Sequence, residues 1–311
     1  MLLRQLEYLT ALAAKRHFAR AAAECHVSQP SLSDAIRKLE DELGVPLVRR
    51  GRRFAGFTPE GERVVMWARR ILAERNALED EISAMREGLT GQLRVGAIPT
   101  ALNATALLTT PLCVEHPLAK ASLEALSSRD ILRRLADADL DVGVSYLDNE
   151  PVPGVRTVAL YEEHYLFLTP LDSEFGAQSS VTWAEISQTP LCLLLDVMQN
   201  RRILDGFFSE AGVVASPAIE TDTISALYAH VATHRWSSVI AHAWLYPLGV
   251  PEGMRVVPVA DQSWHPQVGL LIADREPQPM MVTALLDVAR RTDVRRRMRA
   301  LAARYGVVLP S

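Results

Sequence analysis

The chain has 311 residues, 49% of them hydrophobic and 23% charged, and its formal net charge is −4. This composition is typical of soluble globular proteins and excludes collagen-like and disordered chains, while the short apolar runs exclude a membrane-spanning helix. The length predicts about two domains, and three scattered cysteines without a recognisable secretion signal predict a cytoplasmic protein that has no disulfide framework.

The charge is unevenly distributed along the chain. Residues 1–90 carry 15 Lys and Arg against 13 Asp and Glu, whereas the remainder is acidic. Within the first part, Arg49, Arg50, Arg52 and Arg53 fall within five positions that contain no acid. A basic patch on an acidic chain favours a module that binds a polyanion, and a solvated arginine loop is the alternative.

Three short helices are expected near the N-terminus. Residues 3–13 have an amphipathic pattern, residues 18–25 are rich in alanine, and a third helix begins after its cap Ser28 and ends at Gly44. The apolar positions of the third helix recur at spacings of four and three, so its opposite face is exposed. A tight helix pair followed by a β-wing with the arginines at its tip predicts a winged helix-turn-helix over residues 1–57.

A long helix is expected over residues 58–88, with Thr58 as its cap. Its seam alternates in steps of four and three, which is the pattern of a helix that packs against a partner helix. The seam positions are Val64, Ala68, Ile71, Arg75, Leu78, Ile82, Met85 and Leu89. The seam predicts dimerisation, and packing onto the helix's own domain is the alternative. Arg75 is expected to pair with an acid such as Glu74 or Glu79.

After this helix the pattern changes to strands that alternate with helices. The expected strands are 93–98, 140–146, 163–169, 191–195, 238–241 and 268–273. Such alternation predicts an α/β fold with doubly wound parallel sheets. Residues 89–311 exceed the length of one small sheet, so we expect two lobes with a cleft between them. The first lobe is expected at about 91–160 and 266–311, and the second at about 161–265.

Five motifs stand close together in the first 61 residues. They are Leu3-Arg4-Gln5-Leu6, His17-Phe18-Ala19-Arg20-Ala21-Ala22, Val27-Ser28-Gln29-Pro30-Ser31-Leu32-Ser33, Leu39-Glu40-Asp41-Glu42-Leu43-Gly44-Val45-Pro46-Leu47 and Thr58-Pro59-Glu60-Gly61. In this order they resemble the LysR-type transcriptional regulators. The segment Leu93-Arg94-Val95-Gly96-Ala97-Ile98-Pro99-Thr100 also resembles the first strand of that family's effector domain.

The resemblance implies a winged helix-turn-helix, a dimerising linker helix and two lobes similar to periplasmic binding proteins. It also implies a homotetramer built as a dimer of dimers, promoter DNA as a partner and RNA polymerase as a further candidate partner. No cofactor is expected; the ligand is a small effector, often an anion such as a small carboxylate. Residues 198–205 further resemble a subgroup linked to formate dehydrogenase gene clusters.

The DNA contacts are expected on the outer face of the third helix and on the wing. The expected residues are Gln29, Pro30, Ser31, Ser33, Asp34, Arg37, Lys38, Arg50, Arg52 and Arg53. Gln and Arg can bond adenine and guanine edges, while wing arginines follow the minor groove or the backbone. The family usually has a basic residue where Asp34 stands, so Asp34 is expected to alter site preference by accepting from a cytosine amino group.

The effector is expected where strands end and helices begin. Ligands of doubly wound sheets lie there, and the free N–H groups of helix starts favour anions. The expected contacts are Thr100, Ser127, Ser128, Met198, Gln199, Asn200, Thr223 and Ser238. Each of them taken alone is equally explained as a helix cap.

The predicted function is therefore a DNA-binding regulator that senses a small effector between two lobes. Two alternatives are a small-molecule binding protein and an enzyme with a fused DNA-binding module. No hydrolase elbow, phosphate-binding loop or dinucleotide fingerprint is present, so no enzymatic activity is expected. His230 and His234 lie four apart, but their segment lacks the glutamate of a zinc hydrolase, and no metal site is expected.

Overall fold

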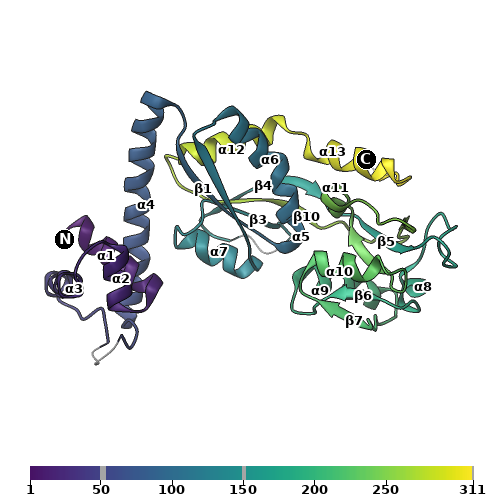
Figure 1. Cartoon of the computed structure of the whole chain (residues 1–311), viewed down its shortest axis with the longest axis horizontal. Helices are drawn as coiled ribbons and strands as arrows, with labels where there is room; N and C mark the ends of the chain where they lie inside the picture. The colour runs from purple at the N-terminus through teal and green to yellow at the C-terminus, as the bar shows by residue number, and fades with distance from the viewer. Residues whose placement is uncertain (50–53, 149–151, 310–311) are drawn as a thin grey trace. The chain divides into compact units, whose positions relative to one another are not determined.

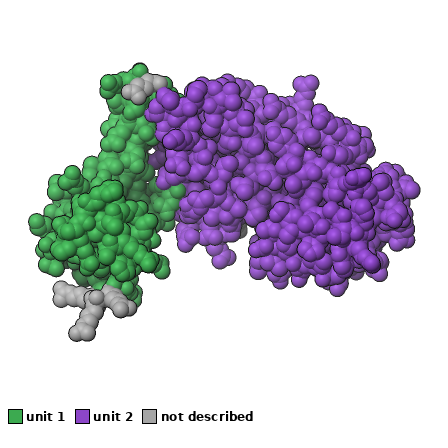
Figure 2. Space-filling model, viewed as in Figure 1, with its two compact units in different colours: residues 1–89, 136–139 green, residues 90–135, 140–311 purple. Residues whose placement is uncertain are grey.

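The computed structural model describes residues 1–49, 54–148 and 152–309. The chain forms two compact units, one of residues 1–89 with 136–139 and one of residues 90–135 with 140–311 (Figure 2). Within the described ranges, no helix combines the length and the apolar character that crossing a membrane requires.

The N-terminal unit contains the expected helices (Figure 1). They are α1 (Leu3–Lys15), α2 (Phe18–Glu24), α3 (Gln29–Leu43) and α4 (Pro59–Glu87). Leucines of α1 and the apolar face of α3 form one core, which Ala21 and Ala22 of α2 complete. Small residues at these two positions let α2 lie close to α3, as a helix-turn-helix requires. Gly44 adopts a left-handed conformation at φ 70° and ends α3 as expected.

The base of the wing is tied to α3 by a carboxylate. Glu40 Oε1 accepts hydrogen bonds from the N–H groups of Leu47 at 2.6 Å and Val48 at 2.9 Å. On the other side of the wing, an antiparallel bridge joins Val48 to Phe57. These bonds fix the chain at both ends of the wing, just after α3 and just before α4. The wing arginines Arg50, Arg52 and Arg53 lie outside the described residues.

The start of α4 locks against the same segment. Thr58 Oγ1 donates to the Pro46 carbonyl oxygen at 2.7 Å and accepts from the Gly61 N–H at 2.9 Å. Gly61 lies so close to the chain that a Cβ atom there would stand 2.0 Å from the Leu47 carbonyl oxygen. Only glycine fits this contact without a shift of the backbone.

The seam of α4 changes character along its length. In its first half, Ala68 is buried and Val64 and Ile71 pack partly buried on the core of the N-terminal unit. In its second half, Leu78, Ile82 and Met85 are 60%, 50% and 74% exposed in the described chain, whereas Leu89 at its end is buried. The alternative of packing within the domain therefore holds for the first half only.

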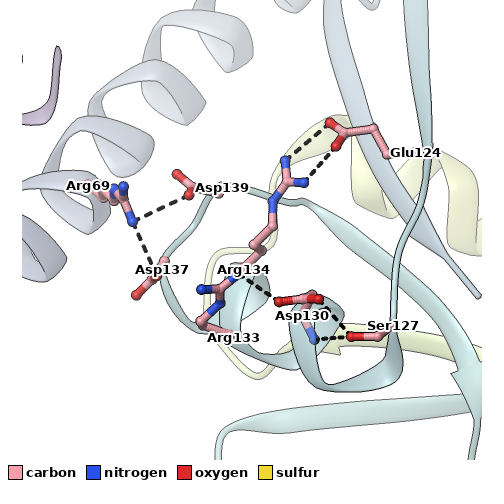
Figure 3. Close-up of polar contacts among 8 residues, drawn as sticks. All are labelled: Arg69, Glu124, Ser127, Asp130, Arg133, Arg134, Asp137 and Asp139. Atoms are coloured by element: carbon pink, nitrogen blue, oxygen red, sulfur yellow. Dashed lines mark hydrogen bonds and ion pairs between the residues drawn. The ribbon is translucent and has the colours of Figure 1, made fainter. Parts of the chain in front are cut away.

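Two arginines of α4 have acidic partners. Arg75 pairs with Glu7 of α1, and its Nε also lies 3.7 Å from Glu79 Oε1, one of the two acids expected for it. Arg69 Nη1 lies 3.2 Å from Asp137 Oδ2 and 3.3 Å from Asp139 Oδ2 (Figure 3).

The first lobe of the C-terminal unit is built on a five-stranded sheet of order β2-β1-β3-β10-β4. The strands are β1 (Gly91–Ala97), β2 (Ala119–Ala125), β3 (Val142–Tyr146), β4 (Val155–Glu162) and β10 (Gln267–Ala273). The helical segments of this lobe are α5 (Pro99–Leu102), η1 (Asn103–Thr105), α6 (Ala106–Glu115), α7 (Ser128–Ala136), α12 (Met280–Arg291) and α13 (Val294–Arg304). Figure 1 shows α6 and α12 on one face of the sheet and α7 on the other.

The second lobe contains two small sheets. One is antiparallel and places β5 (Tyr165–Pro170) between β8 (Ser238–Ala241) and β9 (Met254–Pro258), and the other pairs β6 (Cys192–Leu194) with β7 (Ile219–Thr221) in parallel. Its helical segments are α8 (Trp183–Ser187), α9 (Gln199–Glu210), α10 (Ile224–Val231), η2 (His242–Trp244) and α11 (Leu245–Leu248).

The sheets differ from the all-parallel expectation. In the first lobe β10 runs antiparallel to both β3 and β4. The chain leaves that lobe after β4 through residues 163–164 and returns through residues 259–266, so β10 enters the sheet from the second lobe. The sequence also did not predict β2, β4, β7 and β9, each of which lies at an edge of its sheet. The strands β2 and β4 have exposed polar positions and therefore carry little apolar signal.

Candidate nucleic-acid interface and interlobe site

The N-terminal end of α3 presents a polar face. Ser28 caps the helix, because its Oγ accepts from the Ser31 N–H at 3.3 Å, and Pro30 lies in the first turn. The exposed residues of this face are Gln29, Pro30, Ser31, Asp34, Arg37 and Lys38, and Ser33 is half-buried beside them. Leu32, Ile36 and Leu39 are buried on the opposite face. The predicted DNA contacts on α3 therefore share one outward surface.

Asp34 has a partner on its own helix. Its Oδ1 lies 3.5 Å from Arg37 Nη1, and the two side chains are 62% and 70% exposed. An exposed pair three residues apart is weak, with a stabilisation of about 0.5 kcal/mol, so it leaves Arg37 able to turn to a base or a phosphate. The pairing also lowers the repulsion that a lone carboxylate would exert on phosphate.

A groove runs between α3 and the base of the wing. Ser33, Arg37, Val45, Val48 and Arg49 are among the residues that line it. Arg49 is fixed there, because its Nε donates to the Phe57 carbonyl oxygen at 2.9 Å. Arg49 therefore ties the base of the wing, and the DNA contacts expected of Arg50, Arg52 and Arg53 stay a prediction.

Eight polar side chains meet between the lobes of the C-terminal unit and form what we call the interlobe cluster. They are Thr100, Ser128, Ser145, Tyr146, Glu163, Tyr165, Gln199 and Asn200. Ser145 Oγ donates to Ser128 Oγ at 2.9 Å, and Ser128 Oγ donates to Gln199 Oε1 at 2.6 Å. Since Ser128 belongs to α7 and Gln199 begins α9, these bonds cross from the first lobe to the second.

Glu163 stands at the centre of the cluster and is fully buried. Its Oε2 accepts hydrogen bonds from the hydroxyls of Tyr146 at 2.6 Å and Tyr165 at 2.9 Å. Asn200 Nδ2 donates to the same two hydroxyls at 3.3 and 3.4 Å. Burial raises the pKa of Glu163 to about 7, against the opposing effect of these hydrogen bonds. At a pH near 7 the carboxyl group therefore populates both its neutral and its charged form.

Three buried atoms of the cluster form no hydrogen bond with any residue that the structure describes. They are Glu163 Oε1, Asn200 Oδ1 and Thr100 Oγ1. Of these, Thr100 Oγ1 lies near the Tyr146 hydroxyl but forms no well-aligned hydrogen bond with it. A buried polar atom without a partner is costly, so such atoms mark places where a ligand or water gains hydrogen bonds. The cluster therefore offers a ligand hydrogen-bond acceptors, hydroxyl donors and one carboxyl group, which can donate when it is protonated and accepts when it is charged.

The expected effector residues divide into two groups. Thr100, Ser128, Gln199 and Asn200 belong to the interlobe cluster, and Met198 is the residue that precedes α9. The others have structural roles or lie apart. Ser127 caps α7, because its Oγ accepts from the Asp130 N–H (Figure 3). Thr223 caps α10 in the same way. Ser238 is buried in β8 and forms no hydrogen bond to the cluster.

The sequence analysis missed Ser145, Tyr146, Glu163 and Tyr165. Ser145 and Tyr146 lie at the carboxyl end of β3. Thr100 was chosen because it follows the carboxyl end of a strand, and the same criterion would have selected these two residues. Glu163 and Tyr165 lie in and just after the crossover between the lobes. Their position between the lobes depends on the path of the chain from one lobe to the other, and the periodicity of strands does not predict that path.

The histidines expected not to bind metal are each engaged with the backbone. His230 Nδ1 lies 2.8 Å from the Ala226 carbonyl oxygen, and His234 Nε2 lies 2.8 Å from that of Glu252. In the described part of the chain, no three His, Cys, Asp or Glu side chains form a group that could hold a metal ion.

Both parts of the chain match family models. Residues 3–62 match the model described as bacterial regulatory helix-turn-helix protein, lysR family, and residues 86–293 match the LysR substrate binding domain.

Curated relatives cover most of the chain. It is 32% identical over 280 residues to the DNA-binding transcriptional dual regulator OxyR of Escherichia coli K12, covering 89% of this chain and 91% of that protein. It is 36% identical over 215 residues to the hydrogen peroxide-inducible genes activator of Dickeya chrysanthemi, covering 68% and 70%. The finer resemblance to a subgroup linked to formate dehydrogenase clusters stays a prediction.

Solved structures share the whole architecture. A single-substitution variant of full-length OxyR from Pseudomonas aeruginosa is similar with a TM-score of 0.75 at 27% identity, over 94% of this chain and 99% of that one. Full-length CbnR in complex with its target DNA is similar with a TM-score of 0.66 at 23% identity, over 94% and 100%, which shows the fold alone.

Proposed function

The chain belongs to the LysR family of bacterial transcriptional regulators, and we propose that its interlobe cluster binds a small polar effector that changes how it acts on promoter DNA. As a member of this family it is a DNA-binding regulator with an effector-binding domain, and its matched relatives are regulators rather than enzymes. The observation that carries the proposal is the set of three buried, unpaired atoms on Thr100, Glu163 and Asn200.

We propose a small anion, such as a small carboxylate, as the effector. Two charged carboxylates at hydrogen-bond distance repel, so an anion binds beside Glu163 only when Glu163 is protonated. A pKa of about 7 makes that form accessible at neutral pH. The neutral carboxyl group and the Thr100 hydroxyl then donate to the anion, and Asn200 can reorient its amide to donate as well.

Hydrogen peroxide is not the effector that we propose. Several relatives are named for hydrogen peroxide, and the reaction of a thiol with peroxide proceeds through the thiolate. Burial raises the pKa of Cys192 to about 11, and burial together with Glu24 and Glu7 raises that of Cys25. None of the eight residues of the interlobe cluster is a cysteine, so its chemistry suits hydrogen bonding better than oxidation.

We further propose that the protein acts in the cytoplasm as a dimer of dimers. The exposed apolar residues Leu78, Ile82 and Met85 on α4 support a helix-to-helix dimer contact, because they would gain from burial against a second chain. The tetramer and a contact with RNA polymerase rest on the family resemblance.

The experiment begins by selecting operator DNA from a random duplex library with the full chain. Operator affinity and footprint are then measured with formate, acetate, phosphate and longer carboxylates. We expect at least one anion to change the footprint, and Thr100→Val and Asn200→Ala to abolish this response while operator binding persists. Ser127→Ala, which removes only a helix cap, serves as the control and keeps the response. A response that survives both cluster substitutions contradicts the proposed site.

A further inference from the structure

A second polar pocket lies beside the crossover between the lobes. Its lining residues are Tyr161, Glu162, His164, His242, Arg295 and Arg299. Glu162 and His164 flank Glu163 in the sequence, but Glu163 itself belongs to the interlobe cluster and does not line this pocket. The C-terminal helix α13 packs against β4 and η2 and brings the two arginines to the site. The effector proposal uses none of these six residues.

The pocket contains a buried hydroxyl without a partner. Tyr161 is 1% exposed, and its Oη forms no hydrogen bond within the described chain. Its ring packs edge-to-face with His242 at 5.9 Å between centroids, which fixes the hydroxyl in place. A buried O–H donor without a partner gains a hydrogen bond from an acceptor that can enter the pocket, and an anion is a strong acceptor.

Among the described residues, the charges that line the pocket leave one cation without an ionic partner. Arg295 lies 3.7 Å from Glu162, so these two charges offset one another. Burial, together with repulsion from His265 and Arg299, lowers the pKa of His164 to about 4. Burial, together with repulsion from His164, lowers the pKa of His242 to about 3, so both rings are neutral at pH 7. His265, whose ring lies 4.1 Å from that of His164, also has a lowered pKa. Half-buried Arg299 forms no ion pair with any described residue.

We propose that this pocket binds a small inorganic anion, the size of a halide ion, between the Tyr161 hydroxyl and the Arg299 guanidinium. The free volume of the pocket is about 10 Å³, which is room for about one small group and favours a monatomic ion over a bulky carboxylate. The anion satisfies the hydroxyl and neutralises Arg299. It also joins α13 of the first lobe to His164 and His242, which lie beside strands of the second lobe. Occupancy therefore holds the two lobes in the arrangement seen here.

Thermal unfolding of the full chain tests the proposal. The midpoint is compared in potassium chloride and in potassium gluconate at equal ionic strength, because gluconate is too large for the pocket. We expect chloride to raise the midpoint of the wild type by about 2 °C or more relative to gluconate. Potassium bromide should act like chloride, and its anomalous scattering in crystals should place the ion beside Tyr161.

Three variants make the test specific. Arg299→Gln removes the charge, and Tyr161→Phe removes only the hydroxyl, so each should lose at least half of the chloride-specific increment. Arg297→Gln changes an exposed arginine on the same helix and should keep it. The proposal is overturned if the wild type shows no increment, if both pocket variants keep all of it, or if Arg297→Gln loses as much as they do.

Discussion

Ser128 Oγ donates a hydrogen bond of 2.6 Å to Gln199 Oε1 and so joins α7 in the first lobe to α9 in the second. Ser145 extends this connection through its own bond to Ser128. An effector that enters between the lobes must replace these bonds with others. It regulates only if it binds one lobe arrangement better than another, since equal affinity for both shifts no equilibrium.

The first prediction concerns the pH dependence of stability through Glu163. Burial raises its folded pKa to about 7, above the ordinary value of 4.5, so between these values the folded state binds more protons than the unfolded state. Stability therefore falls as pH rises from about 4.5 to about 7, by up to roughly 3 kcal/mol from this group. Glu163→Gln should remove this part of the dependence, as measured by urea unfolding at pH 5, 6, 7 and 8.

The control is Glu174→Gln, which changes an exposed carboxylate. It should retain the slope of the wild type. A Glu163→Gln protein with the unaltered wild-type slope would show that Glu163 titrates in its ordinary range and that the neutral form is not available to an anionic effector.

The second prediction concerns the contact between α4 and the wing. In Gly61→Ala the new Cβ would meet the Leu47 carbonyl oxygen at 2.0 Å, so the wing base or α4 must move. We expect the N-terminal domain to lose about 3 kcal/mol of stability and operator binding to weaken. Circular dichroism of the full-length variant during urea unfolding measures the loss.

Gly206→Ala is the matched control for this prediction. Gly206 lies within α9, and a Cβ there would meet nothing within 4 Å. Alanine is the better helix former, so this variant should be neutral or more stable by about 0.5–1 kcal/mol. Equal destabilisation by both changes would mean that the close approach to Leu47 is not what Gly61 provides.

Local signals explain what the sequence predicted well. Ser28, Thr58 and Gly44 mark helix ends through caps that act over three or four residues, and the structure has each of them in that role. The spacing of Leu32, Ile36 and Leu39 gave the buried face of α3 in the same way. Such features depend only on residues that are close in the sequence, so they can be predicted from a single sequence.

Long-range pairing explains what was missed. Tyr146 and Glu163 are 17 residues apart and Asn200 is farther still, and only the crossover between lobes brings them together. The same holds for the partner of Arg75, which is Glu7 of α1 in addition to Glu79 of its own helix. No periodicity encodes these contacts, because they follow from the topology of the whole unit.

The third prediction concerns DNA recognition by α3. Arg37 is 70% exposed on the outward surface, and its bond to Asp34 is weak. Arg37→Ala should lower discrimination between operator and random duplex by about 1–3 kcal/mol if Arg37 contacts a guanine with two bonds. Arg52→Ala should instead weaken binding to both duplexes and flatten the dependence on salt. Fluorescence anisotropy at several salt concentrations distinguishes them, and an unchanged operator preference in Arg37→Ala would exclude the assignment.

The fourth prediction concerns assembly through α4. Leu78 and Ile82 are exposed in the described chain, whereas Ile71 of the same seam packs on the core of its own unit. Leu78→Asp combined with Ile82→Asp therefore places two charges in the expected contact without disturbing the N-terminal core, and burying either charge unpaired is expensive. Light scattering should show the wild type as a dimer or tetramer and the double variant at a lower mass. Asn76→Asp, which adds a charge to an exposed position of α4 outside the seam, should keep the mass of the wild type. A double variant of unchanged mass would mean that the exposed half of α4 does not carry the dimer contact.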